Sequence, residues 1–146
     1  MKLIDNTDER LFKVSEECEN PSSYTYKLMT DRMKKILRKY KGIGLSAPQV
    51  GINKRLFIMY IDNILTTCIN PVIITKSDKH NYLKEGCLSF KYTELFLLRP
   101  ERITVFYHTT KGVLITKRLE GLEARCFQHE LDHLDGITFI KRKNEV

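Results

Sequence analysis

The sequence predicts an α+β fold in which mostly antiparallel sheets pack around one central helix that carries metal ligands. Three observations support this prediction. Residues 21–40 have the periodicity of an amphipathic helix, residues 56–115 contain several short strand-like runs, and residues 121–134 return to helical periodicity. The last segment also contains the sequence His-Glu-x-x-His at residues 129–133, which indicates a metal site on that helix.

The composition is that of one globular domain spanning residues 1–146, long enough to bury a core without disulfide bonds. Its four cysteines are irregularly spaced, so we interpret them by default as buried free thiols. No signal peptide or long apolar run is present, and we expect a cytoplasmic protein without a membrane contact. The net charge of +7 comes from scattered basic residues without a nucleic-acid motif, so no DNA partner is expected.

The first helix is expected to follow the Pro21-Ser22-Ser23 segment, with a serine cap, and to end at Gly42. Its apolar residues recur with helical spacing and are predicted to form a packing face: Tyr24, Leu28, Met29, Met33, Ile36, Leu37 and Tyr40. Residues 42–51 come next. Their glycines and Pro48 exclude a regular helix and indicate a loop that closely approaches another part of the molecule.

The strand-like runs have the residue types and the alternation of sheet residues. They span residues 56–61, 68–74 around Pro71, 103–107 and 113–115. Lys111-Gly112 stands between the last two runs and predicts a hairpin turn. A further short strand is expected at residues 137–140. The order of elements is therefore a helix, several strands and a helix laid against the sheet.

The last major helix is predicted to run from about Gly121 to Leu134, with Asp135-Gly136 as a stop signal. One face of this helix contains Leu122, Cys126, His129 and His133. Two histidines four residues apart lie one above the other, so both imidazoles can bind one metal ion, with Glu130 beside it. Such a metal lowers the pKa of bound water, and the neighbouring carboxylate can move its proton.

The alternative to a metal site is a surface helix that contains two histidines by chance. We favour the metal site because the shared face with apolar neighbours turns both imidazoles inward, where they need partners. A third ligand then has to come from upstream, since no residue after Gly136 has the spacing that the common metalloproteases use. Cys87 is the best candidate, and Gly86 lets the backbone approach the metal. A buried structural cysteine remains the alternative.

Three blocks of the sequence resemble the peptide deformylase family in order, spacing and content. They are residues 42–49 (GIGLSAPQ), 85–89 (EGCLS) and 128–133 (QHELDH). The resemblance also reaches residues 1–4 (MKLI), Asn70-Pro71, Arg99-Pro100 and residues 121–125 (GLEAR), so it covers nearly the whole chain. It implies a peptide deformylase-like fold and the hydrolytic removal of the N-formyl group from the formylmethionine of newly synthesised polypeptides, which releases formate.

The resemblance also implies roles for individual residues. Cys87, His129 and His133 would bind one divalent metal ion, and Glu130 would be the general acid and base. The ion of the family is usually Fe2+, and Zn2+, Ni2+ or Co2+ can occupy the same ligands. The catalytic donors to the developing oxyanion would be the side-chain amide of Gln49 and the backbone N–H of Leu88.

A methionine pocket is implied in the same way, with Ile43, Leu122 and Cys126 on its walls. Backbone groups of Ile43, Gly44 and Gly86 would pair with the substrate as an added strand. For Ile43 and Leu122, plain core packing is an alternative interpretation.

Two departures from the family pattern limit these expectations. Ser46 stands where the family usually has alanine, and residues 90–94 (FKYTE) lack the proline-rich, arginine-bearing pattern of many relatives. Preference beyond methionine is therefore open. The short tail after the metal helix resembles organellar-type and virus-encoded members. Because Met1 begins the domain without an Arg- and Ser-rich transit segment, we expect a bacterial or bacteriophage source. We expect a monomer that acts on N-formylmethionyl nascent peptides, with at most a transient proximity to the ribosome.

Two other functions remain open at this point. A zinc peptidase with a His-Glu-x-x-His helix would cleave internal peptide bonds, but it needs a fitting third ligand. A non-catalytic binding module with a structural metal would need a closed coordination shell and would give Glu130 and Gln49 no role.

Overall fold

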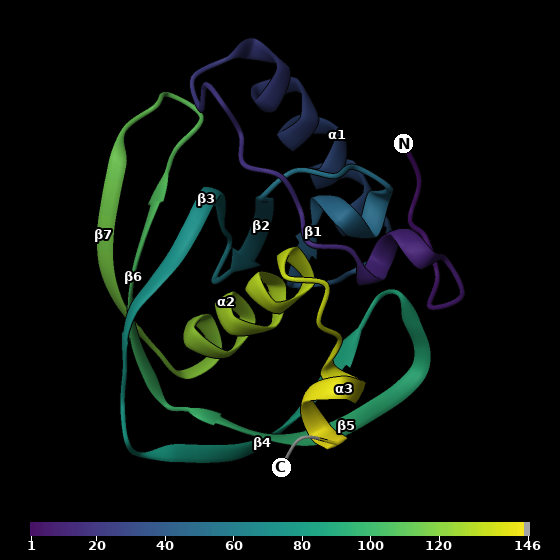
Figure 1. Ribbon diagram of the computed structural model, residues 1–146, viewed down its shortest axis with the longest axis vertical. Helices are drawn as coiled ribbons and strands as arrows, with labels where there is room; N and C mark the ends of the chain where they lie inside the picture. Colours follow the sequence, from purple (N-terminus) through teal and green to yellow (C-terminus); the bar gives the residue numbers. More distant parts are fainter. Residues whose placement is uncertain (145–146) are drawn as a thin grey trace.

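The computed structural model of the chain describes residues 1–144, in which two antiparallel sheets surround helix α2, Gly121–Leu134 (Figure 1). The five-stranded sheet has the order β1 (Gly44–Ser46), β2 (Leu56–Ile61), β3 (Ile64–Lys76), β6 (Arg102–His108) and β7 (Leu114–Glu120). The second sheet is the long hairpin of β4 (His80–Cys87) and β5 (Phe90–Pro100). The predicted α+β class with mostly antiparallel sheets around the central helix is confirmed.

Helix α1, Tyr24–Tyr40, lies where the sequence predicts it. The Ser23 side chain accepts a hydrogen bond from the backbone N–H of Thr25, and Lys41 ends the helix in a left-handed conformation with φ of 55°. The buried face consists of Tyr26, Thr30, Met33 and Leu37. The prediction that Tyr24, Leu28 and Tyr40 belong to the packing face is wrong, because these three side chains are exposed. The buried face of α1 is therefore narrower than the distribution of its apolar residues predicts.

The segment from residue 42 to 51 contains no regular α-helix, as predicted, but it is more ordered than a loop. Strand β1 pairs with β2, with Gly44 opposite Met59, and one turn of 3-10 helix, η2 (Ala47–Val50), follows it directly. Residues 44–50 are buried throughout. Gly51 closes the turn with φ of 78°, a conformation that favours glycine. This segment is thus held in a regular conformation beside α2.

The predicted strand at 68–74 is the middle of the longer β3. Pro71 is tolerated there because the register with β6 shifts between Ile69 and Val72, which marks a bulge. Asn70 adopts φ of 51°, and its side chain bonds the backbone N–H and C=O of Cys18 at 2.8 and 2.9 Å. The predicted turn at Lys111-Gly112 is confirmed, with Gly112 at φ of 77°.

The C-terminal prediction of a short strand at residues 137–140 is wrong. Helix α3, Phe139–Asn144, occupies this region and packs against β5 (Figure 1). Thr138 Oγ1 accepts a hydrogen bond from the backbone N–H of Lys141, which supports the first turn. The Phe139 ring also lies 5.4 Å from the Phe90 ring and 5.7 Å from the His129 ring. This burial of Phe139 orders the short helix.

Helix α2 begins and ends as the sequence predicts. Gly121 is its first residue, with φ of 61°, and Gly136 follows its end with φ of 72°. A Cβ on Gly136 would lie 2.6 Å from the carbonyl oxygen of Phe12, so only glycine fits this stop. The core between α2 and the large sheet includes Phe127 edge-on to Phe57 at 5.0 Å. Among residues 1–144, no helix is long and apolar enough to cross a membrane.

Candidate active site

Three side chains that could hold a metal ion meet at the end of β4. Cys87 is the last residue of β4, and His129 and His133 project from consecutive turns of α2. One ligand atom from each of these residues lies within 4.8 Å of the other two, and Cys87 Sγ is 3.4 Å from His133 Nε2. Both histidines are buried, as the sequence indicates. The structure therefore brings together the three residues that the sequence singled out as ligands.

The surroundings of these residues fit a divalent transition metal. His129 Nδ1 lies 2.8 Å from a carboxylate oxygen of Glu85, so this nitrogen donates to Glu85 and leaves Nε2 for a ligand bond. A thiolate and two imidazoles are a donor set that suits iron, zinc, nickel or cobalt. Three protein ligands also leave a coordination position for water or substrate.

Glu85 is the centre of a buried charge network that the sequence analysis did not assign to the site. It accepts hydrogen bonds from Arg99 and Arg125, and all three side chains are buried. Arg99 also donates to Asp132 at 2.9 Å. Burial opposes ionisation of Glu85, but the hydrogen bonds from His129 and Arg99 outweigh it and lower the Glu85 pKa to about 2. The network thus holds an ionised carboxylate against His129, one of the candidate metal ligands.

The signal for this network is present in the sequence. Glu85 lies inside the EGCLS block, while Arg99, Arg125 and Asp132 occupy otherwise apolar or motif-bearing segments. Glu85 is buried although most of β4 is exposed, and a buried glutamate requires cationic partners. Which arginines supply them depends on distances between segments far apart in the chain, and those come only from the fold.

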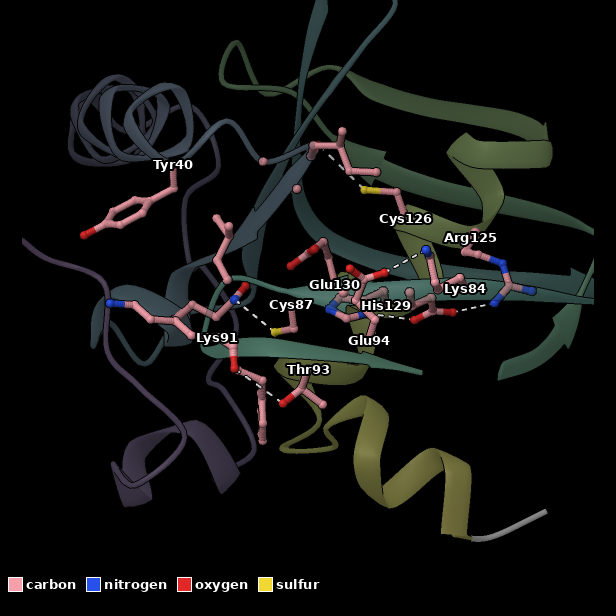
Figure 2. A pocket seen from close by; sticks show the side chains of 18 of the residues that line it. Tyr40, Lys84, Cys87, Lys91, Thr93, Glu94, Arg125, Cys126, His129 and Glu130 are labelled. Carbon is pink, nitrogen blue, oxygen red and sulfur yellow. Dashed lines mark hydrogen bonds and ion pairs between the residues drawn. The ribbon is translucent and has the colours of Figure 1, made fainter. Parts of the chain in front are cut away.

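Glu130 projects into the same space and is 4% exposed. Its Oε1 atom has no hydrogen-bond partner among the described residues. Burial raises the pKa of Glu130 to about 7. A carboxyl group with a pKa near neutrality and a free oxygen can both accept and return a proton. Figure 2 shows Glu130 beside Cys87 and His129.

Gln49 on η2 faces Cys87 from the other side. Its Oε1 atom accepts hydrogen bonds from the backbone N–H and the hydroxyl of Ser46, both at 3.0 Å. Because the backbone N–H can only donate, the Nε2 group must point the other way. It lies 3.6 Å from Cys87 Sγ and 3.3 Å from Ser89 Oγ. Ser46, the departure from the family pattern, therefore helps to orient this amide.

One cavity of about 660 Å3 joins these groups, and Figure 2 shows part of its lining. The predicted residues that line it are Ile43, Gly44, Gln49, Gly86, Cys87, Leu88, Leu122, Cys126, His129 and Glu130. His133 does not line the cavity and lies behind it, 1% exposed. Ile43 and Leu122 are 44% and 54% exposed, so these two side chains face the cavity and are not core residues.

The family model of polypeptide deformylases matches residues 1–146. The chain belongs to the peptide deformylase family. The protein is a metallohydrolase that removes the N-formyl group from nascent peptides. The deformylase prediction is confirmed, and neither the peptidase nor the binding-module alternative is favoured.

Relatives and solved structures agree with this assignment. The peptide deformylase of Natranaerobius thermophilus is 38% identical over 146 residues, which cover 99% of this chain and 93% of the relative. That of Thermotoga neapolitana is 42% identical over 112 residues, covering 77% and 68%. The crystal structure of the Thermotoga maritima peptide deformylase superposes with a TM-score of 0.94 at 37% identity and covers 97% of this chain and 95% of that one.

Proposed function

We propose that residues 1–146 form one deformylase domain built around a single divalent metal ion held by Cys87, His129 and His133. The observation that supports this proposal most strongly is the convergence of three ligand atoms with the unpartnered carboxylate of Glu130 on one cavity. We propose Fe2+ as the natural ion, with Zn2+, Ni2+ or Co2+ as substitutes. A divalent ion bound there supplies Lewis acidity, which makes water acidic and polarises a carbonyl group.

Glu130 moves the proton of the reaction. As a carboxylate it accepts a proton from the water that attacks the formyl carbon. It then donates this proton to the departing amine, which is a poor leaving group without protonation. Its burial and raised pKa suit both steps, because the two protonation states are close in free energy near neutral pH.

Gln49 and Leu88 stabilise the negative charge that develops on the formyl oxygen. Gln49 Nε2 is directed toward Cys87 by the bonds that Ser46 makes to the amide oxygen. Leu88 follows Cys87 directly and lines the same cavity, so its backbone N–H is the second donor. Donors that are held before the reaction begins stabilise an oxyanion without reorganisation.

The methionine side chain enters the cavity and packs against its apolar residues Ile43, Leu122 and Cys126. Backbone groups of Ile43, Gly44 and Gly86 pair with the substrate as an added strand, since β1 and β4 border the cavity. A peptide deformylase of Acinetobacter baumannii, 27% identical with a TM-score of 0.92, has been solved bound to Met-Ala-Ser. A tripeptide of this kind is the product that we assign to the cavity.

Glu130→Gln tests the mechanism. The amide keeps the size of the side chain but cannot accept a proton, so turnover of formyl-Met-Ala-Ser should fall by roughly a hundredfold to ten-thousandfold. Metal content and thermal stability serve as controls and should stay close to those of the parent protein. Unchanged turnover with intact metal would refute the role of Glu130.

The metal assignment has its own test. Protein purified without oxygen should contain about one equivalent of iron, and its activity should decay in air as the ligand thiolate oxidises. Nickel-substituted protein should retain activity under the same exposure. Iron absent from anaerobic preparations would contradict the assignment. Monomeric state, a cytoplasmic location in a bacterial or phage-infected cell, and transient proximity to the ribosome stay predictions.

A further inference from the structure

The mouth of the active-site cavity carries lysines from three separate elements. Lys41 ends α1, Lys84 lies in β4 and Lys91 lies in β5, and all three side chains are exposed. We call them the mouth lysines. In Figure 2, Lys91 lies on the opposite side of the cavity from Lys84 and Glu94. When methionine occupies the cavity, the residues that follow it in the peptide must pass out of the cavity between these lysines.

Among the described residues, one of the three mouth lysines forms an ion pair. Lys84 Nζ forms an ion pair with Glu94 Oε2 at 3.0 Å. Lys41 and Lys91 form no ion pair within residues 1–144, although the charge of Lys91 makes a small contribution to the lowered pKa of Asp5, after the hydrogen bonds from Thr7. The remaining acids of the cavity, Glu85 and Glu130, are buried. Two exposed positive charges at the mouth are therefore not held in an ion pair by any of residues 1–144.

The same positive edge continues beyond the cavity. A second groove of about 380 Å3 shares Lys41, Gly42 and Ile43 with the active-site cavity. Its other basic residues are Lys34 and Arg38 of α1, and neither forms an ion pair within the part of the chain that the structure describes. A peptide segment that leaves the mouth on this side would meet cations along its path.

We infer that this enzyme prefers formylated peptides with acidic side chains in the residues directly after methionine. The inference rests on the proposed function, because it requires the peptide to occupy the cavity with methionine innermost. Methionine itself meets an apolar wall, so the mouth charges act only on the following residues. Complementary charges raise the rate of encounter and strengthen binding, and salt screens both effects.

The test compares three amidated peptides, so that a terminal carboxylate adds no charge: formyl-Met-Ala-Ser, formyl-Met-Glu-Glu and formyl-Met-Lys-Lys. Formate release by the metal-loaded enzyme gives kcat/KM for each. At low ionic strength we expect the acidic peptide to exceed the basic one by about tenfold, chiefly through KM. The ratio should approach one in about 1 M sodium chloride, where the screening length is only about 3 Å.

Charge-reversal variants assign the effect to the mouth. Lys41→Glu and Lys91→Glu should each lower the ratio of acidic to basic peptide severalfold, and together they should invert it. Lys111→Glu is the matched control, because it changes the net charge equally at the exposed turn between β6 and β7. It should leave the ratio close to that of the parent enzyme.

Two results would overturn the inference while leaving the deformylase function intact. One is a ratio near one for the parent enzyme at low salt. The other is an equal loss of preference in Lys111→Glu, which would assign the effect to net charge and not to the mouth. Formate release from none of the three peptides would instead overturn the proposed function, and the inference with it.

Discussion

Gly44 is packed directly against the residues that line the active site. A Cβ atom at this position would lie 2.6 Å from Glu130 Oε2 and 2.7 Å from Cys126 Sγ. The backbone of β1 at Gly44 therefore lies so close to α2 that no side chain fits between them. The glycine is required by this close approach, and the position of the Glu130 carboxyl group depends on it.

Gly44→Ala should accordingly damage both activity and stability. The added methyl group must displace the Glu130 carboxyl group or separate β1 from α2. We expect kcat to fall roughly a hundredfold, because small displacements of a catalytic group are costly. The free energy of unfolding, measured in urea, should fall by about 1–3 kcal/mol.

Gly86→Ala provides the control for stability. A Cβ there meets nothing nearer than the Thr93 carbonyl oxygen at 4.0 Å. Its free energy of unfolding should stay within about 1 kcal/mol of the parent value. If Gly44→Ala proved as stable and as active as the parent, the close approach would have no functional importance.

At this scale the sequence identified the three candidate metal ligands, which the structure brings together, but it did not identify the residues that support them. Cys87, His129 and His133 carry rare chemistry at motif spacing, so they stand out without a structure. The sequence does not show that Arg99 and Arg125 pair with Glu85. Their role emerges only because β4, β5 and α2 converge on Glu85 in three dimensions.

At the level of elements, Arg125 joins helix α2 to the β4–β5 hairpin. Its guanidinium donates to Glu85, to the carbonyl oxygen of Leu97 and to the carbonyl and side-chain oxygens of Asn81. One side chain thus fixes both strands of the hairpin against the helix that carries the histidines. The relative position of Cys87 and His129 depends on this connection.

Arg125→Met should loosen the connection while retaining most of the apolar packing of the side chain. Glu85 keeps Arg99 and His129 but loses one of its buried cations, and the carbonyl oxygens of Leu97 and Asn81 lose a donor, so the free energy of unfolding should fall by about 3 kcal/mol. Urea denaturation measures this loss. Arg118→Met on the exposed face of β7 is the control and should change stability by no more than about 0.5 kcal/mol. Equal small effects would show that Arg125 contributes little.

Element prediction was most successful where the residue pattern was regular. Both long helices and the strand at 56–61 follow from periodicity and end signals. The β4–β5 hairpin was not predicted as strands, because charged residues interrupt it and its ladder depends on pairing across the chain. The expected strand at 137–140 failed because the burial of Phe139 against β5 and α2 decided its conformation.

At the scale of the whole molecule, the ligand cluster connects α2 of the main sheet core to the β4–β5 hairpin. A bound ion would add stability by linking Cys87 of the hairpin to the two histidines of the helix. Binding at about 100 times the dissociation constant adds roughly 2.7 kcal/mol of stability. For a chain of this size, that shifts the melting temperature by about 10 °C.

Chelation should therefore lower the melting temperature of metal-loaded protein by about 10 °C, and readdition of the ion should restore it. Cys87→Ser weakens the site with little change in volume. Scanning calorimetry of that variant should show a much smaller difference between its chelated and metal-supplemented forms. The same full shift in Cys87→Ser would mean that the ion is held elsewhere.

The most direct test of the central claim is formate release from formyl-Met-Ala-Ser by protein purified without oxygen and loaded with Fe2+ or Ni2+. The acetylated peptide is the control for specificity. We predict turnover of the formyl peptide alone, lost after chelation and recovered with metal. A folded, metal-loaded protein that releases no formate, or that cleaves both peptides equally, would contradict a metal-dependent deformylase built on Cys87, His129 and His133.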